Sequence, residues 1–139
     1  GEIFEPSFNE YTTSEARPIR EVEDKLEHNR DGSLRQSNRT DAQPVSPAVV
    51  SDELSEHLAT AAKIAHRALG ARHYSLFDFR VHEDTGEAFM LEAGLFWSFS
   101  TLSAISKMLT GSGEDPTDVA LEVWSSAAGK DGVEIEKAA

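Results

Sequence analysis

Two strand-like runs of residues on either side of a tight turn constrain the fold of this chain most strongly. Residues 72–82 (RHYSLFDFRVH) show a period of two, residues 87–94 (EAFMLEAG) form a second apolar-rich run, and residues 83–86 (EDTG) between them are typical of a turn. Successive side chains of a strand point to opposite faces of its sheet. The pattern predicts a β-hairpin. In its first strand one face carries Phe77, Phe79 and Val81, and the other carries Tyr74, Leu76, Asp78 and Arg80. In its second strand one face carries Phe89, Leu91 and Ala93, and the other carries Ala88, Met90 and Glu92.

Three helices are expected around this hairpin. The first begins after Ser51, a residue type that caps helix N-termini, and ends before Gly70, which suits a left-handed C-terminal cap. The second is predicted over residues 100–109, and the third begins at Asp115 with Pro116 as its first helical residue. The sequence therefore predicts an α+β fold, an antiparallel sheet with flanking helices. The expected apolar positions are Leu54, Leu58, Ala61, Ala65 and Ala68 in the first helix, Leu102, Ile105 and Leu109 in the second, and Val119, Ala120, Val123 and Trp124 in the third.

The hydrophobic pattern divides the chain into four parts. Residues 1–13 contain two short apolar–polar alternations, which are typical of short strands. Residues 14–47 are polar and have almost no large apolar side chains. Because such a stretch cannot bury enough surface to offset its own ordering entropy, we expect a long mobile loop there. Residues 48–128 carry the hairpin and the helices, and residues 129–139 form a charged tail.

The charge balance and the lack of cysteine exclude several classes of protein. The 25 Asp and Glu residues outnumber the 13 Lys and Arg residues, and the net charge of −12 would repel a nucleic-acid backbone. No cysteine is present to form a disulfide or a thiolate zinc site. No apolar run is long enough to span a membrane, and the N-terminus lacks a signal-peptide pattern. We therefore expect a cytoplasmic protein that binds neither nucleic acid nor membrane.

Two carboxylates on the hairpin are the main candidates for chemistry. If His82 pairs with Ala88, then Asp78 lies opposite Glu92 and both side chains project from one face. Like charges directly opposite each other are unfavourable in a sheet, so this pairing suggests a cation between them. Mg²⁺ suits such a site, because it takes one or two carboxylates together with nucleotide phosphates. The alternative is a register shifted by one residue, with one of the carboxylates facing solvent.

These features also occur together in a known family. The first helix ends in Ala-Leu-Gly (68–70), the next strand carries Asp78, and the hairpin returns with Leu-Glu-Ala-Gly (91–94). In this pattern residues 47–125 resemble the C-terminal part of an ATP-grasp ligase of the D-alanine–D-alanine ligase type. The resemblance implies the C-terminal lobe of an ATP-grasp fold with ATP and Mg²⁺ as cofactors. It matches Asp78 and Glu92 to the family's metal-binding carboxylates and assigns Leu91 to nucleotide binding.

The same resemblance implies roles for residues outside the hairpin. Glu15-Ala16-Arg17 resembles a Glu-Ala-Lys step whose lysine reaches the nucleotide phosphates, which makes Arg17 the expected catalytic and ATP-binding residue. The helix start near residue 100 resembles a segment whose serine holds the substrate carboxylate, which assigns Ser103 to substrate binding. Trp97 falls in the stretch that lines the substrate pocket, and the aromatic residues there predict substrates larger than alanine.

The implied reaction joins a small-molecule carboxylate to an amine through an acyl phosphate. The glycine-rich lid and the phosphate-binding lysines of the family precede the segment that this chain resembles. We therefore expect activity to require the remainder of an ATP-grasp protein or a complementary chain, and the isolated chain to be inactive.

Three departures from the family pattern favour a second hypothesis. Gly94 replaces a metal-ligating Asn, Leu76 replaces an Arg that stabilises the tetrahedral intermediate, and residues 97–100 (WSFS) replace a glycine-containing substrate turn. Loss of one preorganised donor at a developing oxyanion typically costs about 3–4 kcal/mol. Arg80 could replace the missing Arg, although we expect it to be a solvated partner of the nearby acids. The alternative function is therefore a non-catalytic ATP-grasp module that binds a nucleotide or a partner.

Overall fold

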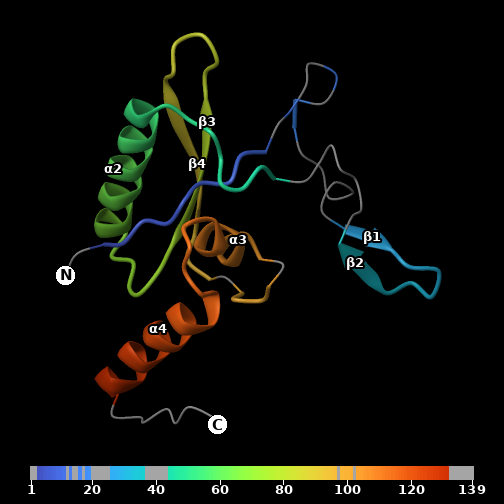
Figure 1. Ribbon diagram of the computed structural model, residues 1–139, viewed down its shortest axis with the longest axis vertical. Coiled ribbons are helices and arrows are strands. Elements are labelled where there is room, and N and C mark those ends of the chain that lie inside the picture. The colour runs from blue at the N-terminus through green and yellow to red at the C-terminus, as the bar shows by residue number, and fades with distance from the viewer. Residues whose placement is uncertain are drawn as a thin grey trace.

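The chain is an α+β protein built around a central β-hairpin. The computed structural model describes residues 3–11, 13, 16, 18–19, 26–36, 44–96, 98–101 and 103–131. Figure 1 shows α2 along one side of the β3–β4 hairpin, α3 and α4 towards its base, and the β1–β2 hairpin apart from the other elements. The expected α+β class, antiparallel strands with flanking helices, is confirmed. The elements are β1 (Leu26–His28), β2 (Leu34–Gln36), α2 (Asp52–Ala68), β3 (Leu76–Val81), β4 (Ala88–Gly94), α3 (Ala104–Gly111) and α4 (Pro116–Asp131).

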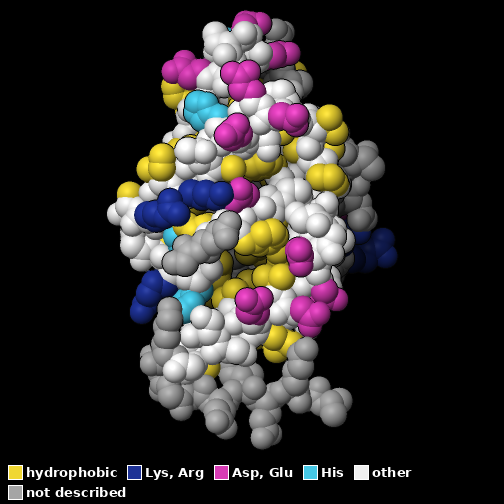
Figure 2. All heavy atoms as spheres, turned by 60° about the vertical axis from the view of Figure 1, so that its left-hand side comes forward, with side chains coloured by type: hydrophobic (Ala, Val, Ile, Leu, Met, Phe, Trp, Pro, Cys, Tyr) yellow, Lys and Arg dark blue, Asp and Glu magenta, His cyan; other side chains and the backbone are white. Residues whose placement is uncertain are grey.

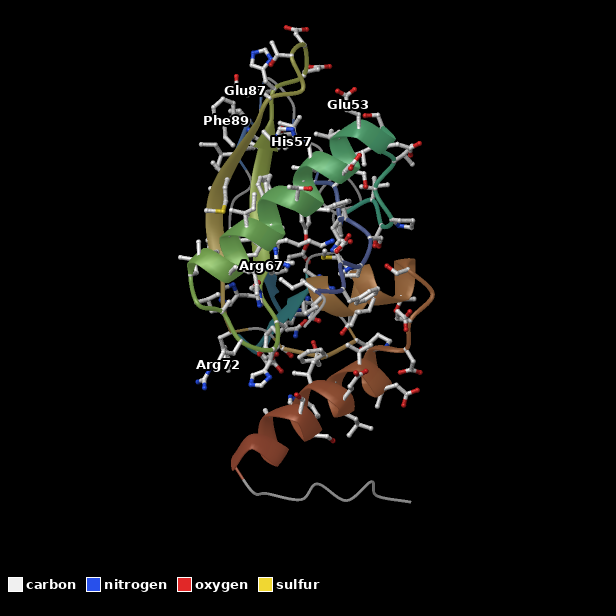
Figure 3. All side chains as sticks on the ribbon, turned by 90° about the vertical axis from the view of Figure 1, so that its left-hand side faces the viewer. Glu53, His57, Arg67, Arg72, Glu87 and Phe89 are labelled. Atoms are coloured by element: carbon white, nitrogen blue, oxygen red, sulfur yellow. The ribbon has the colours of Figure 1, made fainter. Side chains whose placement is uncertain are left out.

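Helix α2 begins and ends where its capping residues predict. The Ser51 hydroxyl accepts a hydrogen bond from the Leu54 N–H at 3.2 Å. Gly70 has a φ of +62°, a conformation that ends helices and that glycine adopts without strain. Leu58 is the buried residue of this helix, with 6% of its surface exposed. Figures 1 and 3 together place α2 along one face of β3–β4.

The β3–β4 hairpin brings Asp78 opposite Glu92, but one extra residue disturbs its register. Asp78 pairs with Glu92, whereas the next residue, Phe79, pairs with Met90. Leu91 is therefore a β-bulge in β4. The predicted pairing of His82 with Ala88 is wrong because this bulge shifts the outer half of the hairpin by one residue. The observed pairs are Leu76–Gly94, Phe77–Ala93, Asp78–Glu92, Phe79–Met90, Arg80–Phe89 and Val81–Ala88.

The bulge also exchanges residues between the two faces of the hairpin. Phe77 and Phe79 are half-buried, on the face that packs towards α2. The opposite face, which we call the carboxylate face, is formed by Leu76, Asp78, Arg80, Phe89, Glu92 and Gly94. Phe89 was predicted on the face opposite to Glu92, and it shares the face of Glu92 because one inserted residue reverses the alternation. Figure 3 shows the Phe89 side chain projecting away from α2.

The most buried side chains of the described residues belong to the three helices. Leu109 is 2% exposed, Ala120 is 3% exposed and Ile105 is 8% exposed, in agreement with their predicted core positions. Helix α3 begins at Ala104 rather than near residue 100, because the Ser103 hydroxyl caps it by accepting the Ser106 N–H at 3.2 Å. Helix α4 begins as predicted, with the Asp115 carboxylate accepting the Thr117 N–H at 2.7 Å.

Aromatic packing joins the start of the hairpin to α4. Phe99 makes an edge-to-face contact with Tyr74 at a centroid distance of 5.3 Å and another with Trp124 at 5.8 Å. Trp124 was predicted to be buried, but 48% of its surface is exposed. The prediction is wrong because the contact with Phe99 covers only part of the indole and the rest of the ring reaches solvent.

The N-terminal segment holds α3 through side chains rather than through a sheet. The Ser7 hydroxyl donates to the Met108 carbonyl at 2.8 Å, and the Asn9 amide donates to the Ala104 carbonyl at 3.1 Å. The predicted strands in residues 1–13 reduce, within residues 3–11, to a single antiparallel bridge between Glu10 and Val45. This segment therefore fastens α3 to residues 44–50 at the base of the fold.

A short hairpin lies inside the polar segment, residues 14–47, that the sequence predicts to be a mobile loop. β1 pairs with β2, and Arg35 forms a salt bridge with Glu27 at 2.7 Å. In the turn of this hairpin, the Ser33 hydroxyl and the Ser33 N–H both donate hydrogen bonds to the Asp31 carboxylate. These bonds hold the pKa of Asp31 below its usual value, and the bond from the hydroxyl has the larger effect. The charged tail beyond residue 131 lies outside the described residues.

Gly111 allows the N-terminal segment to approach α3 closely. A Cβ atom on Gly111 would lie 2.7 Å from the Ser7 hydroxyl oxygen and 3.4 Å from the Pro47 nitrogen. We expect Gly111→Ala to lower the free energy of unfolding by about 1–3 kcal/mol, because the Ser7 hydroxyl is held by the Met108 carbonyl and must shift. Urea denaturation followed by circular dichroism measures the change.

The matched control is Gly129→Ala in α4, where a Cβ atom would meet nothing within 4 Å. This variant should be more stable than the original chain by about 0.5–1 kcal/mol, because alanine favours a helix interior. Equal effects of the two substitutions would contradict the packing described for Gly111.

Candidate functional site

The carboxylate face of the hairpin holds the two residues that the sequence predicts to bind a metal ion. Asp78 in β3 and Glu92 in β4 are direct Cα partners across the antiparallel strands, and both residues are exposed. Directly opposed residues of antiparallel strands have their Cβ atoms about 4.5–5.5 Å apart, so carboxylates at these positions are within reach of one ion. The predicted juxtaposition is therefore confirmed at the level of the strand register.

The Asp78–Glu92 pair fits an ion that takes few ligands from the protein. No group of three or more His, Cys, Asp or Glu side chains within the described ranges could hold a metal ion. Two oxygen ligands from one hairpin fit Mg²⁺, which keeps several water or phosphate ligands when it binds proteins. A metal that needs a closed cage of protein ligands fits this face poorly.

Arg80 connects the carboxylate face to the N-terminal part of the chain. Its guanidinium donates a hydrogen bond to the Pro18 carbonyl at 2.6 Å and a longer one to the Thr13 hydroxyl at 3.4 Å. The sequence predicts Arg80 to be a solvated partner for the nearby acids and does not predict these contacts. They hold Thr13 and Pro18, which lie on either side of Arg17 in the sequence, beside the carboxylate face. Arg17 itself lies outside the described residues.

The two departures from the family pattern near the predicted metal site face each other. Leu76 and Gly94 are direct Cα partners, and they lie two residues from Asp78 and Glu92 along their strands. Positions at which the family carries an Arg and an Asn therefore form one cross-strand pair with no polar side chain. The two replacements are far apart in the sequence, but the hairpin register shows that both remove a polar side chain from the same cross-strand pair.

Leu91 and Ser103, two further predicted site residues, lie in well-defined local structures. Leu91 is the bulge residue of β4, and 64% of its surface is exposed. Ser103 caps α3, and its hydroxyl also donates to the Ser106 hydroxyl at 3.1 Å. The Ser103 hydroxyl thus already has one donor and one acceptor partner within α3.

The aromatic residues after Glu92 differ in their burial. Phe96 is 91% exposed, whereas Phe99 packs between Tyr74 and Trp124. Trp97, the predicted substrate-binding residue between them, lies outside the described residues. The prediction that these aromatic residues favour a substrate larger than alanine remains a prediction.

Comparison with known proteins does not assign the chain to a family. No protein-family model matches the chain, and neither a curated protein nor a solved structure shows a significant match. Among the described residues, no helix is both long enough and apolar enough to cross a membrane.

Proposed function

We propose that this chain is part of an ATP-dependent carboxylate–amine ligase with an ATP-grasp fold, to which it contributes the Mg²⁺-binding carboxylates Asp78 and Glu92. The observation that carries the proposal is the direct pairing of these two residues across β3 and β4, on the face turned away from α2. The resemblance of residues 47–125 to D-alanine–D-alanine ligases supplies the reaction class. The substrates are amino acids or similar small carboxylates and amines, and the enzyme works in the cytoplasm.

The contacts of Arg80 support this assignment independently of the carboxylates. Arg80 lies on the carboxylate face and binds the backbone of Pro18, the residue after Arg17. In the proposed enzyme Arg17 contacts the phosphates of ATP, so its chain segment has to lie near the metal ion. The hydrogen bond from Arg80 to Pro18 keeps the residue that follows Arg17 in the sequence beside the face that carries Asp78 and Glu92.

The remaining residues have proposed roles that follow from the resemblance. Mg²⁺, when bound with ATP, screens the negative charge of the phosphate that is transferred. Leu91 and Arg17 contribute to the nucleotide site, and Trp97 and Ser103 contribute to the substrate site. Ser103 lies at the N-terminus of α3, where backbone N–H groups favour a carboxylate.

The Leu76–Gly94 pair favours a second candidate function, a non-catalytic ATP-grasp module that binds a nucleotide or a partner. This pair lies beside the metal carboxylates and offers no donor for a developing oxyanion. A protein that only binds ATP does not need such a donor, whereas a ligase must obtain it from another residue.

Phosphate release from ATP distinguishes these two functions. We expect the full-length protein to release phosphate in the presence of ATP and Mg²⁺, and to do so faster with one of a panel of amino acids and small carboxylates. ATP binding by calorimetry without phosphate release for any substrate would support the non-catalytic module. Absence of both ATP binding and phosphate release would contradict both functions.

A further inference from the structure

The outer edge of β4 carries a row of exposed hydrophobic side chains. Phe89 is 50% exposed, Met90 is 49% exposed and Leu91 is 64% exposed. Phe89 lies on the carboxylate face and Met90 on the face towards α2. Because side chains from both faces are half-exposed at neighbouring positions, the surface they form is an open strand edge rather than one open face of a sheet.

Among the described residues, no other strand pairs with the outer edge of β4. The His82 N–H donates to the Glu87 carbonyl at 2.8 Å, which fixes Glu87 as a residue that bonds inward to β3. In an antiparallel hairpin inward and outward residues alternate, so Ala88 and Met90 direct their N–H and C=O groups outward. In the described part of the chain β4 pairs with β3 alone. The bulge at Leu91 ends this regular outward run.

Acidic residues bound the apolar row at both ends. Glu87 precedes Ala88 and Glu92 follows Leu91, and the exposed Glu83 and Asp84 lie at the adjacent turn. Figure 2 shows Asp and Glu side chains gathered around the hairpin tip at the top of the view. A second copy of this chain is a poor occupant, because each copy has a net charge of −12 and would bring further carboxylates to this edge.

We propose that the edge of β4, residues 88–91, binds an extended segment of another protein whose short apolar run has Lys or Arg at each end. The segment adds a strand to the hairpin, with backbone hydrogen bonds to Ala88 and Met90. Its apolar side chains cover Phe89, Met90 and Leu91, and its two basic ends face Glu87 and Glu92. The proposal goes beyond the ligase function at Glu87, Ala88 and Met90, which lie outside the proposed ATP and substrate sites, whereas Leu91 and Glu92 are also assigned to the nucleotide and metal sites.

A labelled peptide tests this surface directly. We expect a fluorescein-labelled Lys-Thr-Val-Tyr-Val-Arg peptide to bind the chain saturably in a fluorescence anisotropy titration. The same peptide with Glu at both ends should bind at least about tenfold more weakly, because it places like charges together. Binding of the basic peptide should also weaken as salt is added. Equal binding of the two peptides, or no binding of the basic one, would overturn the proposal.

Two variants at one position separate backbone pairing from side-chain contact. Met90→Pro removes an outward N–H while it leaves the inward bonds of β4 to β3, and proline is tolerated on such an edge. It should weaken peptide binding about tenfold more than Met90→Ala, which keeps that N–H. Equal binding by these two variants would overturn strand addition. If Met90→Pro fails to fold, a peptide N-methylated at its pairing positions gives the same comparison, and undiminished binding of that peptide would also overturn it.

The charge at the end of the row gives the last comparison. Glu87→Gln should lower the affinity for the basic peptide, by about twofold to tenfold, and remove part of its salt dependence. Glu87 lies outside the proposed metal site, so this result does not depend on whether Asp78 and Glu92 bind an ion. A stable dimer of the chain in sedimentation equilibrium that Met90→Pro abolishes would identify the occupant as a second copy and overturn the proposal.

Discussion

Replacing Leu109 with alanine is expected to lower the free energy of unfolding by about 2–5 kcal/mol. Leu109 is 2% exposed and is one of the buried residues of α3, so removal of its side chain leaves a cavity. Small domains are stable by only about 5–15 kcal/mol in total, so this loss would unfold a large fraction of the molecules at moderate urea concentrations. Urea denaturation followed by circular dichroism measures it.

Leu95→Ala is the matched control for this prediction, because it removes the same atoms from a side chain that is 52% exposed. It should change the free energy of unfolding by less than about 1 kcal/mol. If Leu95→Ala were as destabilising as Leu109→Ala, the core would not be centred on α3.

The sequence predicts those parts of the fold that depend on local signals. Ser51 and Gly70 mark the ends of α2 within one residue, because capping depends on side chains next to the helix. The alternation around the turn at residues 83–86 predicts the hairpin and the opposition of Asp78 and Glu92. That opposition survives the wrong outer register because the bulge at Leu91 falls between the turn and the carboxylates.

Other features depend on contacts that a single sequence does not show. The bulge at Leu91 lies in a run of consecutive apolar residues, 88–91, and such a run does not show where an extra residue is inserted. Helix α3 begins at Ala104 and not near residue 100, because hydrophobic spacing predicts that a helix is present but does not fix its first residue. The role of Arg80 arises from contacts with Thr13 and Pro18, more than 60 residues away in the sequence. The turn of the β1–β2 hairpin, in contrast, contains Asp31 and Gly32, residue types that favour turns and could have revealed it.

Removal of either carboxylate from the carboxylate face is expected to have the largest effect on metal binding. Asp78→Asn and Glu92→Gln should each lower the affinity for Mn²⁺, a spectroscopic substitute for Mg²⁺, by about tenfold to 100-fold or more. The reason is that each substitution replaces one of two charged oxygen ligands with a neutral amide. The double variant should lose specific binding. Both single variants should keep the circular dichroism of the original chain, because Asp78 and Glu92 are exposed.

Glu87→Gln is the matched control, because it removes the same charge from an exposed carboxylate on the same hairpin. It should leave the Mn²⁺ affinity unchanged within about twofold, since Glu87 does not pair with Asp78 or Glu92. A loss of affinity equal to that of Glu92→Gln would show that the ion responds to the overall charge of the protein and not to a site.

Titration of the chain with Mn²⁺, with free Mn²⁺ measured by electron paramagnetic resonance, tests the proposed site most directly. We predict one saturable site in the original chain and in Glu87→Gln, weakened in Asp78→Asn and in Glu92→Gln and absent from the double variant. Mn²⁺ binding by the original chain that is no tighter than binding by the double variant would contradict the assignment of Asp78 and Glu92 as metal ligands.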